Sequence, residues 1–240
     1  MTEARLVLGI QPVREAIRAH GSGLARVAVM HGGNRRLEAL ARFASDQGVT
    51  VERIPRGKLD ALSGGVSHQG AAAWAPPLEL VAVEALAVPN ALIVALDGIT
   101  DPHNFGATIR SAVALGASAV LWGEHHAAPL TPATFRASAG AIEHARLCRV
   151  TSLKSAIAEL RDRAITTISL DLGAERTLAE LDLAAPIALV IGSEDEGVSR
   201  GVRQLCQQHA RLPMTSTIGS LNASVAAAVA VYEAQRQRKP

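Results

Sequence analysis

The sequence predicts an α/β protein built from two parts, and three observations carry that prediction. Short apolar runs of strand length alternate with helical segments along most of the chain, a pattern typical of α/β folds. Pro76 and Pro77 interrupt the alternation, and the stretch up to residue 90 has the weak periodicity of a linker. The chain has 240 residues, of which 48% are hydrophobic and 19% charged, and this suits one large or two small globular domains.

The first part, up to about residue 75, is predicted to be a small α/β unit. Pro12 suits the first turn of a helix, because its fixed φ matches the helical value. Asn34 is a typical N-cap, and the helix after it has an apolar face formed by residues 37, 40, 41 and 44. The expected strands are residues 6–10, 25–30, 49–54 and 71–74, and the expected helices are residues 12–19, 34–47 and 55–62.

In the second part, from residue 91, strands again alternate with helices. This pattern predicts a mostly parallel sheet that is covered by helices on both faces. Its segments 91–96 and 187–191 are apolar throughout, as expected for strands that are buried on both faces. Further strands are expected at residues 119–122, 146–150, 165–170 and 210–212, and helices at residues 104–115, 131–138, 153–161, from 199, and 221–237.

Basic residues are concentrated in the first part. Residues 1–77 carry ten Lys or Arg and six Asp or Glu, whereas residues 78–240 carry fourteen and sixteen. Of the 24 basic residues, 21 are arginine, whose planar guanidinium suits the recognition of phosphates and bases. Codon usage in a GC-rich genome explains the same preference, so composition alone leaves nucleic-acid binding open.

The composition favours a cytoplasmic location without a membrane span. Cys148 and Cys206 are the only cysteines, too few and too far apart for a disulfide framework or a Cys-x-x-Cys metal clip. The first residues lack the apolar core of a signal peptide. The longest apolar stretch, residues 80–96, is interrupted by Glu84, Pro89 and Asn90.

Three loops rich in Gly, Asn, Asp or Ser follow predicted strands, at residues 97–110, 190–197 and 212–224. Because ligands of open α/β sheets bind beyond the carboxyl ends of the strands, these loops form the candidate site. In the first loop, Asn104 and Arg110 are candidate site residues. Alternatively, Asn104 is a helix cap and Arg110 is a surface charge. Asp101 and His103 are further candidates for that cap.

The other two loops carry acidic and hydroxyl side chains. Residues 194–196 are three carboxylates between two glycines, and they could bind a metal, a ribose hydroxyl or a cationic group, or form a solvated turn. Glycine lets a ligand approach the backbone closely. Ser220 and Asn222 precede the last helix, where Ser220 is a candidate N-cap and where a helix N-terminus also suits a phosphate.

Several common sites are absent from the sequence. It contains neither a Gly-x-Gly-x-x-Gly fingerprint nor a Walker A motif, which disfavours a nicotinamide-dependent oxidoreductase. Glu124, His125 and His126 are adjacent, so they cannot easily face one ion, and we expect no metal.

Together the three loops resemble the signature segments of the SpoU/TrmH-type RNA ribose methyltransferases of the SPOUT superfamily. The segments read DPHNFGATIRSA, LVIGSEDEG and LPMTSTIGSLNASVAAA, in this order in the second part of the chain. GIQPVREAI and SHQGAAA in the first part are similar to the substrate-binding domain of the bacterial 23S rRNA guanosine 2′-O-methyltransferases of this family. The resemblance covers nearly the whole chain.

The resemblance implies a fold, a cofactor and an assembly. The implied fold is a small L30e-like RNA-binding domain at residues 1–77, a linker at 78–90 and a SpoU-type α/β catalytic domain at 91–240 with a C-terminal trefoil knot. The implied cofactor is S-adenosylmethionine, held by the backbone around Gly192, Leu212, Met214 and Leu221. The implied assembly is a homodimer, in which two-fold contacts are self-complementary.

The final helix would contribute to that dimer. Residues 221, 225, 228, 229 and 232 are apolar or small at spacings of three and four, which makes an apolar stripe. We expect part of the stripe to pack on the sheet and the resemblance places this helix at the symmetric interface.

The implied reaction is attack of a guanosine 2′-oxygen in 23S rRNA on the methyl group of the cofactor. The residues that match the functional positions of the family are Asn104, Arg110, Glu194, Ser220 and Asn222. Arg110 is the base in the family account, but arginine stays protonated, so we expect it to contact the ribose-phosphate and to stabilise oxyanion charge. Ser220 would position the target, while Asn104 and Glu194 would hold Arg110 and the loops in place.

Two residues depart from the family pattern, because Asp195 stands at a usual glycine and Gly219 at a common serine. These departures keep a catalytically silent RNA-binding paralogue as an alternative. A tRNA guanosine is a second alternative, although the basic first part favours rRNA.

Overall fold

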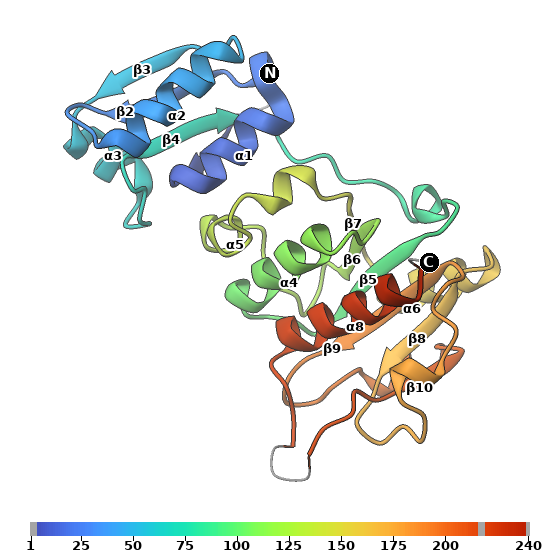
Figure 1. Cartoon of the computed structure of the whole chain (residues 1–240). Coiled ribbons are helices and arrows are strands. Elements are labelled where there is room, and N and C mark those ends of the chain that lie inside the picture. Colours follow the sequence, from blue (N-terminus) through green and yellow to red (C-terminus); the bar gives the residue numbers. More distant parts are fainter. Residues whose placement is uncertain (1–3, 216–218, 239–240) are drawn as a thin grey trace. The chain divides into compact units, whose positions relative to one another are not determined.

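The computed structural model describes residues 4–215 and 219–238, and the chain forms two compact units (Figure 1). The first unit contains residues up to 78 together with residues 130–144. The second unit contains residues 79–129 and the chain from residue 145 onwards. The predicted domain division at residues 77 and 91 stays a prediction, and by packing alone residues 130–144 belong with the first unit.

The first unit contains a four-stranded sheet in the order β1–β4–β2–β3. β4 is antiparallel to both of its neighbours, whereas β2 and β3 are parallel. Its main elements, all within a few residues of their predicted positions, are β1 (Arg5–Leu8), α1 (Ile10–His20), β2 (Arg26–Met30), α2 (Arg35–Asp46), β3 (Val51–Ile54), α3 (Arg56–Ser63) and β4 (Ala71–Ala75).

The two faces of this sheet have separate cores, as the period of two along a strand requires. Val27 and Val29 of β2 pack with buried residues of α1 and α2, whereas Ala28 faces the other way, toward Leu59 of α3. Asn34 caps α2 as predicted, since its Oδ1 accepts the N–H groups of residues 36 and 37 at 3.0 and 3.2 Å.

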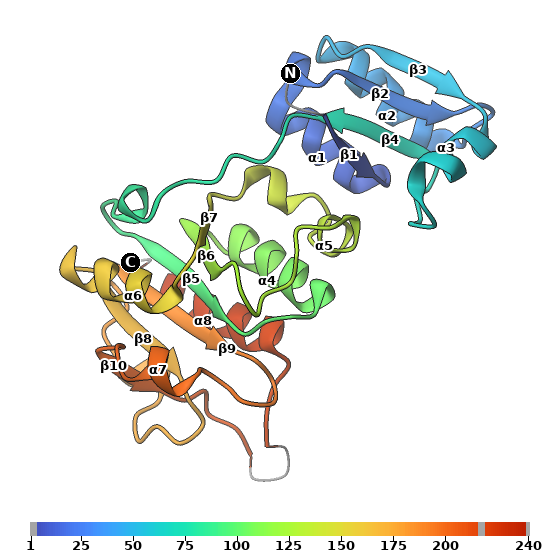
Figure 2. The ribbon, with the colours of Figure 1, turned by 180° about the vertical axis from the view of Figure 1, so that it is seen from behind.

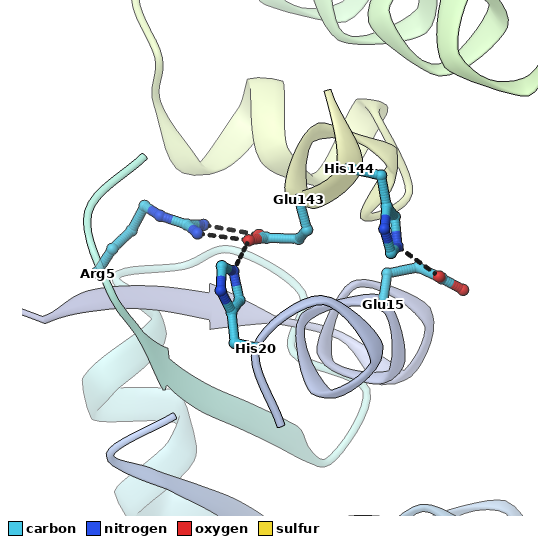
Figure 3. Close-up of polar contacts among 5 residues, drawn as sticks. All are labelled: Arg5, Glu15, His20, Glu143 and His144. Carbon is cyan, nitrogen blue, oxygen red and sulfur yellow. Dashed lines mark hydrogen bonds and ion pairs between the residues drawn. The ribbon is translucent and has the colours of Figure 1, made fainter. Parts of the chain in front are cut away.

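Residues 130–144 pack on the first unit through two charged clusters (Figure 3). This segment contains α5 (Pro132–Ala137) and a short 3-10 helix (Ala141–His144). Both guanidinium nitrogens of Arg5 donate to Glu143, at 2.8 and 2.6 Å, and His20 Nε2 lies 3.0 Å from the same carboxylate. Because the Glu143 side chain is only 1% exposed, its charge is stable there only with these partners.

A second contact ties the same segment to α1. His144 Nε2 lies 3.0 Å from Glu15 Oε2. Gly140 has a φ of +88°, and a Cβ there would lie 2.9 Å from Pro12 Cα. The positive φ and the lack of room for a Cβ both require glycine at position 140.

The second unit contains a six-stranded sheet in the order β10–β8–β9–β5–β6–β7, and every pair of neighbours is parallel, as predicted. β10 lies two residues earlier than predicted. The elements are β5 (Leu92–Asp97), α4 (Pro102–Ala114), β6 (Ala119–Gly123), β7 (Leu147–Val150), α6 (Leu153–Asp162), β8 (Thr166–Leu170), β9 (Ile187–Gly192), α7 (Arg200–Arg203), β10 (Gln208–Ala210) and α8 (Ala223–Arg238).

Helices cover both faces of this sheet. α4 and α8 pack together on one face, and α6 and α7 lie on the other (Figures 1 and 2). The chain leaves β5 toward β6 and leaves β9 toward β10, so the direction of the connections reverses between these two neighbouring strands. Such a switch point opens a crevice at the carboxyl ends of the strands, where α/β proteins bind ligands.

α8 packs on the sheet through a face of small residues rather than through the predicted stripe. The buried residues of this helix are Ala223, Ala227, Ala230, Val231 and Ala234. Val225, Val229 and Tyr232 are 46%, 41% and 59% exposed. The expectation that part of the stripe packs on the sheet is wrong for its large side chains, because alanines allow a closer approach of helix to sheet. Among residues 4–215 and 219–238, no helix is long and apolar enough to cross a membrane.

Candidate active site

The three loops identified in the sequence meet at the switch point of the second unit. β5 and β9 are paired in register, with Asp97 opposite Gly192, so the loops after these strands start side by side. The third loop leads from Leu212 into α8. Its residues 216–218 lie outside the described residues, whereas Ser220 and Asn222 are described.

The loop after β9 folds back on itself directly after the strand. Gly197 donates its N–H to the carbonyl of Ser193 at 2.9 Å, and the Ser193 hydroxyl accepts the N–H of Glu196 at 3.2 Å. A Cβ on Gly192 would lie 1.9 Å from the carbonyl carbon of Gly197 and 2.1 Å from the nitrogen of Val198. Only glycine therefore allows this close crossing of backbone over backbone.

Asn104, Glu194 and Asn222 form one hydrogen-bond network that joins the three loops. Glu194 Oε1 accepts the amide N–H groups of Asn104 at 2.6 Å and of Asn222 at 2.7 Å. The same oxygen accepts the backbone N–H of Ala223 at 3.2 Å, at the start of α8. Asn222 Nδ2 also donates to Asn104 Oδ1 at 2.9 Å. The carboxylate is favoured at this position, because the N-terminus of a helix carries partial positive charge.

The starts of the two helices at this site decide between the predicted caps. Asp101, one of the three candidates, caps α4 by accepting the N–H groups of His103 and Asn104, so Asn104 is not the cap. At α8 the helix begins at Ala223, and Asn222 Oδ1 accepts the N–H of Ser224 at 3.0 Å. The predicted Ser220 cap is wrong, because Ser220 lies too far from the first helical turn.

The predicted cofactor residues line a single cavity, here named the loop cavity. It has a volume of about 270 Å³. Its lining includes Gly192, Leu212, Met214 and Leu221, together with Glu194 and Ser220. The structure thus brings together six of the nine residues singled out in the sequence, and Asn104 and Asn222 are joined to them through Glu194.

Arg110 is not part of this network. It is an exposed residue of α4 and makes no hydrogen bond or ion pair with any residue that the structure describes. The contacts of Asn104 and Glu194 are with each other and with Asn222. The expectation that they hold Arg110 therefore has no counterpart among the contacts of the described residues, while their role in holding the loops together fits the network.

One further carboxylate, Asp171, belongs to the site, and a second, Asp97, lies at the start of the first loop; neither was singled out in the sequence. Asp171 lines the loop cavity and forms an ion pair with Arg203 of α7. Asp97 accepts the N–H of Ser199 at 2.7 Å, which ties β5 to the chain before α7. Both residues stand at the carboxyl end of a strand, and this position was the signal that could have found them.

The loop cavity has an acidic lining. Asp171 and residues 194–196 contribute four carboxylates, and Arg203, paired with Asp171, is the single cation among the described lining residues. Asp195 has no positive φ, so an aspartate in place of glycine fits this turn without strain. A Cβ on Gly219 would meet no heavy atom of a described residue within 4 Å. The two departures from the family pattern therefore leave the geometry of the site intact.

Neither cysteine of the chain is activated as a nucleophile. Burial raises the pKa of Cys206 to about 12, and the negative charge of Asp97 acts in the same direction. Burial likewise raises the pKa of Cys148 to about 11. In the described part of the chain, no group of three His, Cys, Asp or Glu side chains is arranged to hold a metal ion.

Comparisons with known proteins give one consistent result. The model of the SpoU rRNA Methylase family matches residues 91–232, and a model described as RNA 2′-O ribose methyltransferase substrate binding matches residues 6–81. A protein of Mycobacterium avium (strain 104), named uncharacterized tRNA/rRNA methyltransferase, is 39% identical over 243 residues, which cover 99% of this chain and 79% of the relative.

Solved structures agree with this result. A crystal structure of an RNA 2′-O ribose methyltransferase is 28% identical, with a TM-score of 0.81, and the match covers 99% of this chain and 90% of that chain. The SpoU methyltransferase AviRb from Streptomyces viridochromogenes, in complex with the cofactor AdoMet, is also 28% identical, with a TM-score of 0.77 and coverage of 97% and 90%.

Proposed function

The chain belongs to the SpoU family of RNA 2′-O-ribose methyltransferases, and from this premise we propose that it methylates the ribose of a guanosine in 23S rRNA with S-adenosylmethionine as methyl donor. The observation that carries the proposal is the loop cavity, where residues from three separate loops meet beside the Asn104–Glu194–Asn222 network.

The loop cavity fits the proposed cofactor in its chemistry. The cofactor, also called AdoMet, combines a flat aromatic adenine with a sulfonium, an ammonium and a carboxylate group, so its net charge is positive. A relative that was solved with AdoMet has the same fold as this chain. Leu170, Ile191 and Leu212 give the cavity an apolar side, and its four carboxylates favour a cationic ligand. When bound, S-adenosylmethionine supplies a methyl group on a positively charged sulfur. The backbone around Gly192, Leu212, Met214 and Leu221 would hold it.

Arg110 is the residue we assign to the ribose. Its exposure and its lack of a partner among the described residues leave the guanidinium donors available to RNA. The guanidinium stabilises the negative charge that develops on the 2′-oxygen as the proton of this oxygen passes to solvent water. Ser220, at the cavity, positions the target nucleotide. Holding nucleophile and methyl group in line is itself a large part of such catalysis.

The network has a positioning role in this proposal. Each of the three side chains comes from a different loop, and their hydrogen bonds fix the loops relative to one another. Asn104 is also the residue six positions before Arg110 on α4. The network therefore fixes the helix that carries Arg110 against the cavity without contacting Arg110.

Several finer features belong to the same proposal. We propose a trefoil knot in the last part of the chain, which the match of residues 91–232 to the SpoU family supports. We propose an L30e-like fold for the first unit, supported by its three-layer arrangement of helices around a mixed sheet. Two free, buried cysteines support a cytoplasmic location.

We also propose a homodimer formed through α8. Val225, Val229 and Tyr232 lie exposed on one helix, with Leu221 just before it, and adjacent exposed apolar side chains mark interaction surfaces more often than isolated ones do. A two-fold contact would bury them against the same residues of a second copy.

The RNA substrate is either rRNA or tRNA. The family description and the basic first part favour rRNA, whereas the name of the mycobacterial relative includes both tRNA and rRNA. Mapping 2′-O-methyl groups in the rRNA and tRNA of a deletion strain separates the two. Loss of one guanosine methyl group in 23S rRNA supports the proposal, and loss of one in tRNA selects the alternative.

Cofactor binding separates an enzyme from a silent RNA-binding paralogue. Titration calorimetry with S-adenosylmethionine and with NAD on the purified chain is the direct test. Binding of S-adenosylmethionine alone is expected, and binding of neither molecule would favour the silent paralogue.

A further inference from the structure

We propose that a groove between α1 and α2 of the first unit holds an unpaired stretch of the substrate RNA. The groove, here named the arginine groove, has a volume of about 810 Å³. It would hold a backbone phosphate at Arg14 and Arg36 and an unstacked base at Phe43. This inference rests on the proposed function, since it takes RNA as the substrate. The residues that line the groove are Ile10, Gln11, Arg14, Asn34, Arg36, Ala39, Leu40, Phe43 and Gln69.

The arginine groove is distinguished by cations that no carboxylate neutralises. Among the described residues, its lining contains two arginines and no acidic side chain. Neither Arg14 nor Arg36 forms an ion pair with a described residue. An exposed concave surface of one charge sign concentrates ligands of the opposite sign.

Two acidic residues of the same helices, Glu15 and Glu38, are already paired with other cations, and Asp46 at the end of α2 does not line the groove. Glu15 of α1 accepts from Arg18 at 2.7 Å and faces His144 at 3.0 Å. Glu38 of α2 binds both guanidinium nitrogens of Arg53 at 2.7 Å, and this hydrogen bonding lowers the pKa of the Glu38 carboxyl. These pairs lie outside the lining of the groove. The positive charge of Arg14 and Arg36 is therefore left for a ligand.

The groove also offers a flat surface for a base. The guanidinium of Arg14 lies over the ring of Phe43, 5.8 Å from its centroid. Phe43 lines the groove and is half-buried. It is one of only three phenylalanines in the chain. Stacking of splayed-out bases on aromatic rings and guanidinium planes is a common way to bind single-stranded RNA.

Amide groups around the groove could contact the edge of such a base. Gln69 Oε1 accepts the N–H of Ile10 at 3.1 Å, which leaves its amide N–H groups as donors. Gln11 Nε2 donates to Glu15, which leaves its carbonyl oxygen as an acceptor. Asn34 uses its oxygen to cap α2 and keeps its amide N–H groups. The lining thus presents both donors and an acceptor.

The starts of both helices also lie at this groove. Ile10 and Gln11 are the first residues of α1, and Asn34 is the N-cap of α2. Partial positive charge at two helix N-termini adds to that of the arginines. A phosphate with an attached base satisfies all of these features, whereas a duplex keeps its bases stacked and out of reach.

The test measures binding of the full chain to a short single-stranded RNA and to the same sequence as a duplex, by fluorescence anisotropy. The Arg14→Ala/Arg36→Ala variant should bind the single strand about tenfold or more weakly, since hydrogen bonds to charged groups are the strong ones. Its dependence of log K on log salt should be shallower by about 0.7, as expected when the contact to one phosphate of a single strand is lost.

The matched control is Arg18→Ala/Arg53→Ala, which removes the same charge from exposed ion pairs outside the groove. It should bind within about threefold of the unchanged protein, because exposed ion pairs contribute little. Phe43→Leu should weaken binding about fivefold or more through lost stacking, with an unchanged salt dependence. Circular dichroism melting of each variant verifies that the first unit is folded.

Three results would overturn the inference: an Arg14→Ala/Arg36→Ala variant that binds RNA as well as the control, a Phe43→Leu variant with unchanged affinity, or equal affinity of the unchanged protein for duplex and single strand. The proposed function fails separately. If the chain binds RNA through the groove but transfers no methyl group to any RNA, the groove stands and the methyltransferase proposal falls.

Discussion

The loop cavity and the arginine groove differ most in the sign of their charge. The cavity is lined by four carboxylates and one arginine that is already paired, whereas the described lining of the groove contains two unpaired arginines and no acidic residue. An acidic lining favours a cationic ligand such as a sulfonium, and a basic lining favours a polyanion such as RNA.

This contrast arises from pairing rather than from composition. The chain has a net charge of only +2, and five of the arginines in the first unit are paired with carboxylates. The arginines that matter for binding are those without a partner. Counting charges along a sequence therefore indicates a class of ligand, and only the contacts indicate the place where it binds.

The largest expected effect concerns Arg110, which lines neither site. Arg110→Ala should lower methyl transfer about 10²–10³-fold, the loss typical for removal of one oxyanion-stabilising donor. Affinity for S-adenosylmethionine by calorimetry and affinity for RNA by anisotropy should stay close to normal. Such a result would show that catalysis needs a residue in addition to the two binding sites.

Arg110→Lys is the informative companion variant. It should also be inactive, because a compact ammonium group does not reproduce the planar fork of donors. Near-normal turnover of Arg110→Ala would mean that Arg110 is only a surface charge.

Gly192→Ala should distort the loop cavity and leave the arginine groove unchanged. Its Cβ would overlap the backbone of Gly197, so we expect a loss of about 1–3 kcal/mol in stability. Because the loop is displaced, the affinity for the cofactor should fall about tenfold or more. RNA affinity should change little.

Gly219→Ala is the matched control in the neighbouring loop, since its Cβ meets open space. It should melt and bind cofactor as the unchanged protein does. Equal effects of the two substitutions would contradict the role assigned to the close crossing at Gly192.

Val229→Arg should separate assembly from folding. Because Val229 is 41% exposed on α8, the substitution should leave the thermal melting of the unit unchanged and convert a dimer to a monomer in light scattering. A matched change is Arg236→Ala, at an exposed residue of the same helix, which should leave the dimer intact. A monomer in the unchanged protein at micromolar concentration would refute the dimer proposal.

The smallest expected effect concerns the two cysteines. Burial holds the pKa of Cys148 and Cys206 at about 11 and 12, so both remain thiols at neutral pH and react slowly. A thiol reagent should label neither residue in the folded chain and both in denaturant. As pH rises above about 9, the unfolded thiols ionise first, so these residues lower stability at alkaline pH.

Local sequence patterns predicted the elements and the place of the site. Periodicity located nearly every strand and helix, because apolar residues must face a core with the period of their element. Asn34 was recognised as a cap because its hydrogen bonds involve only its own helix. The loops were found because parallel strands bring their carboxyl ends to one edge of the sheet.

Contacts between distant residues were not predictable in the same way. Arg5 and Glu143 are 138 positions apart, and nothing in the local sequence around Glu143 indicates its partner. Ser220 and Asn222 are both good capping residues, and the choice between them depends on Glu194, which lies in another loop. Such choices are made by tertiary packing.

The most direct test of the central claim is a methyl-transfer assay with the purified chain. The protein is incubated with isotope-labelled S-adenosylmethionine and either 23S rRNA or tRNA that lacks the modification, and the RNA is digested to nucleosides for mass spectrometry. Labelled 2′-O-methylguanosine from 23S rRNA is the predicted result, formed about 10²–10³-fold more slowly with Arg110→Ala. Label in a base, or no label in any RNA although the protein binds the cofactor, would contradict ribose methylation.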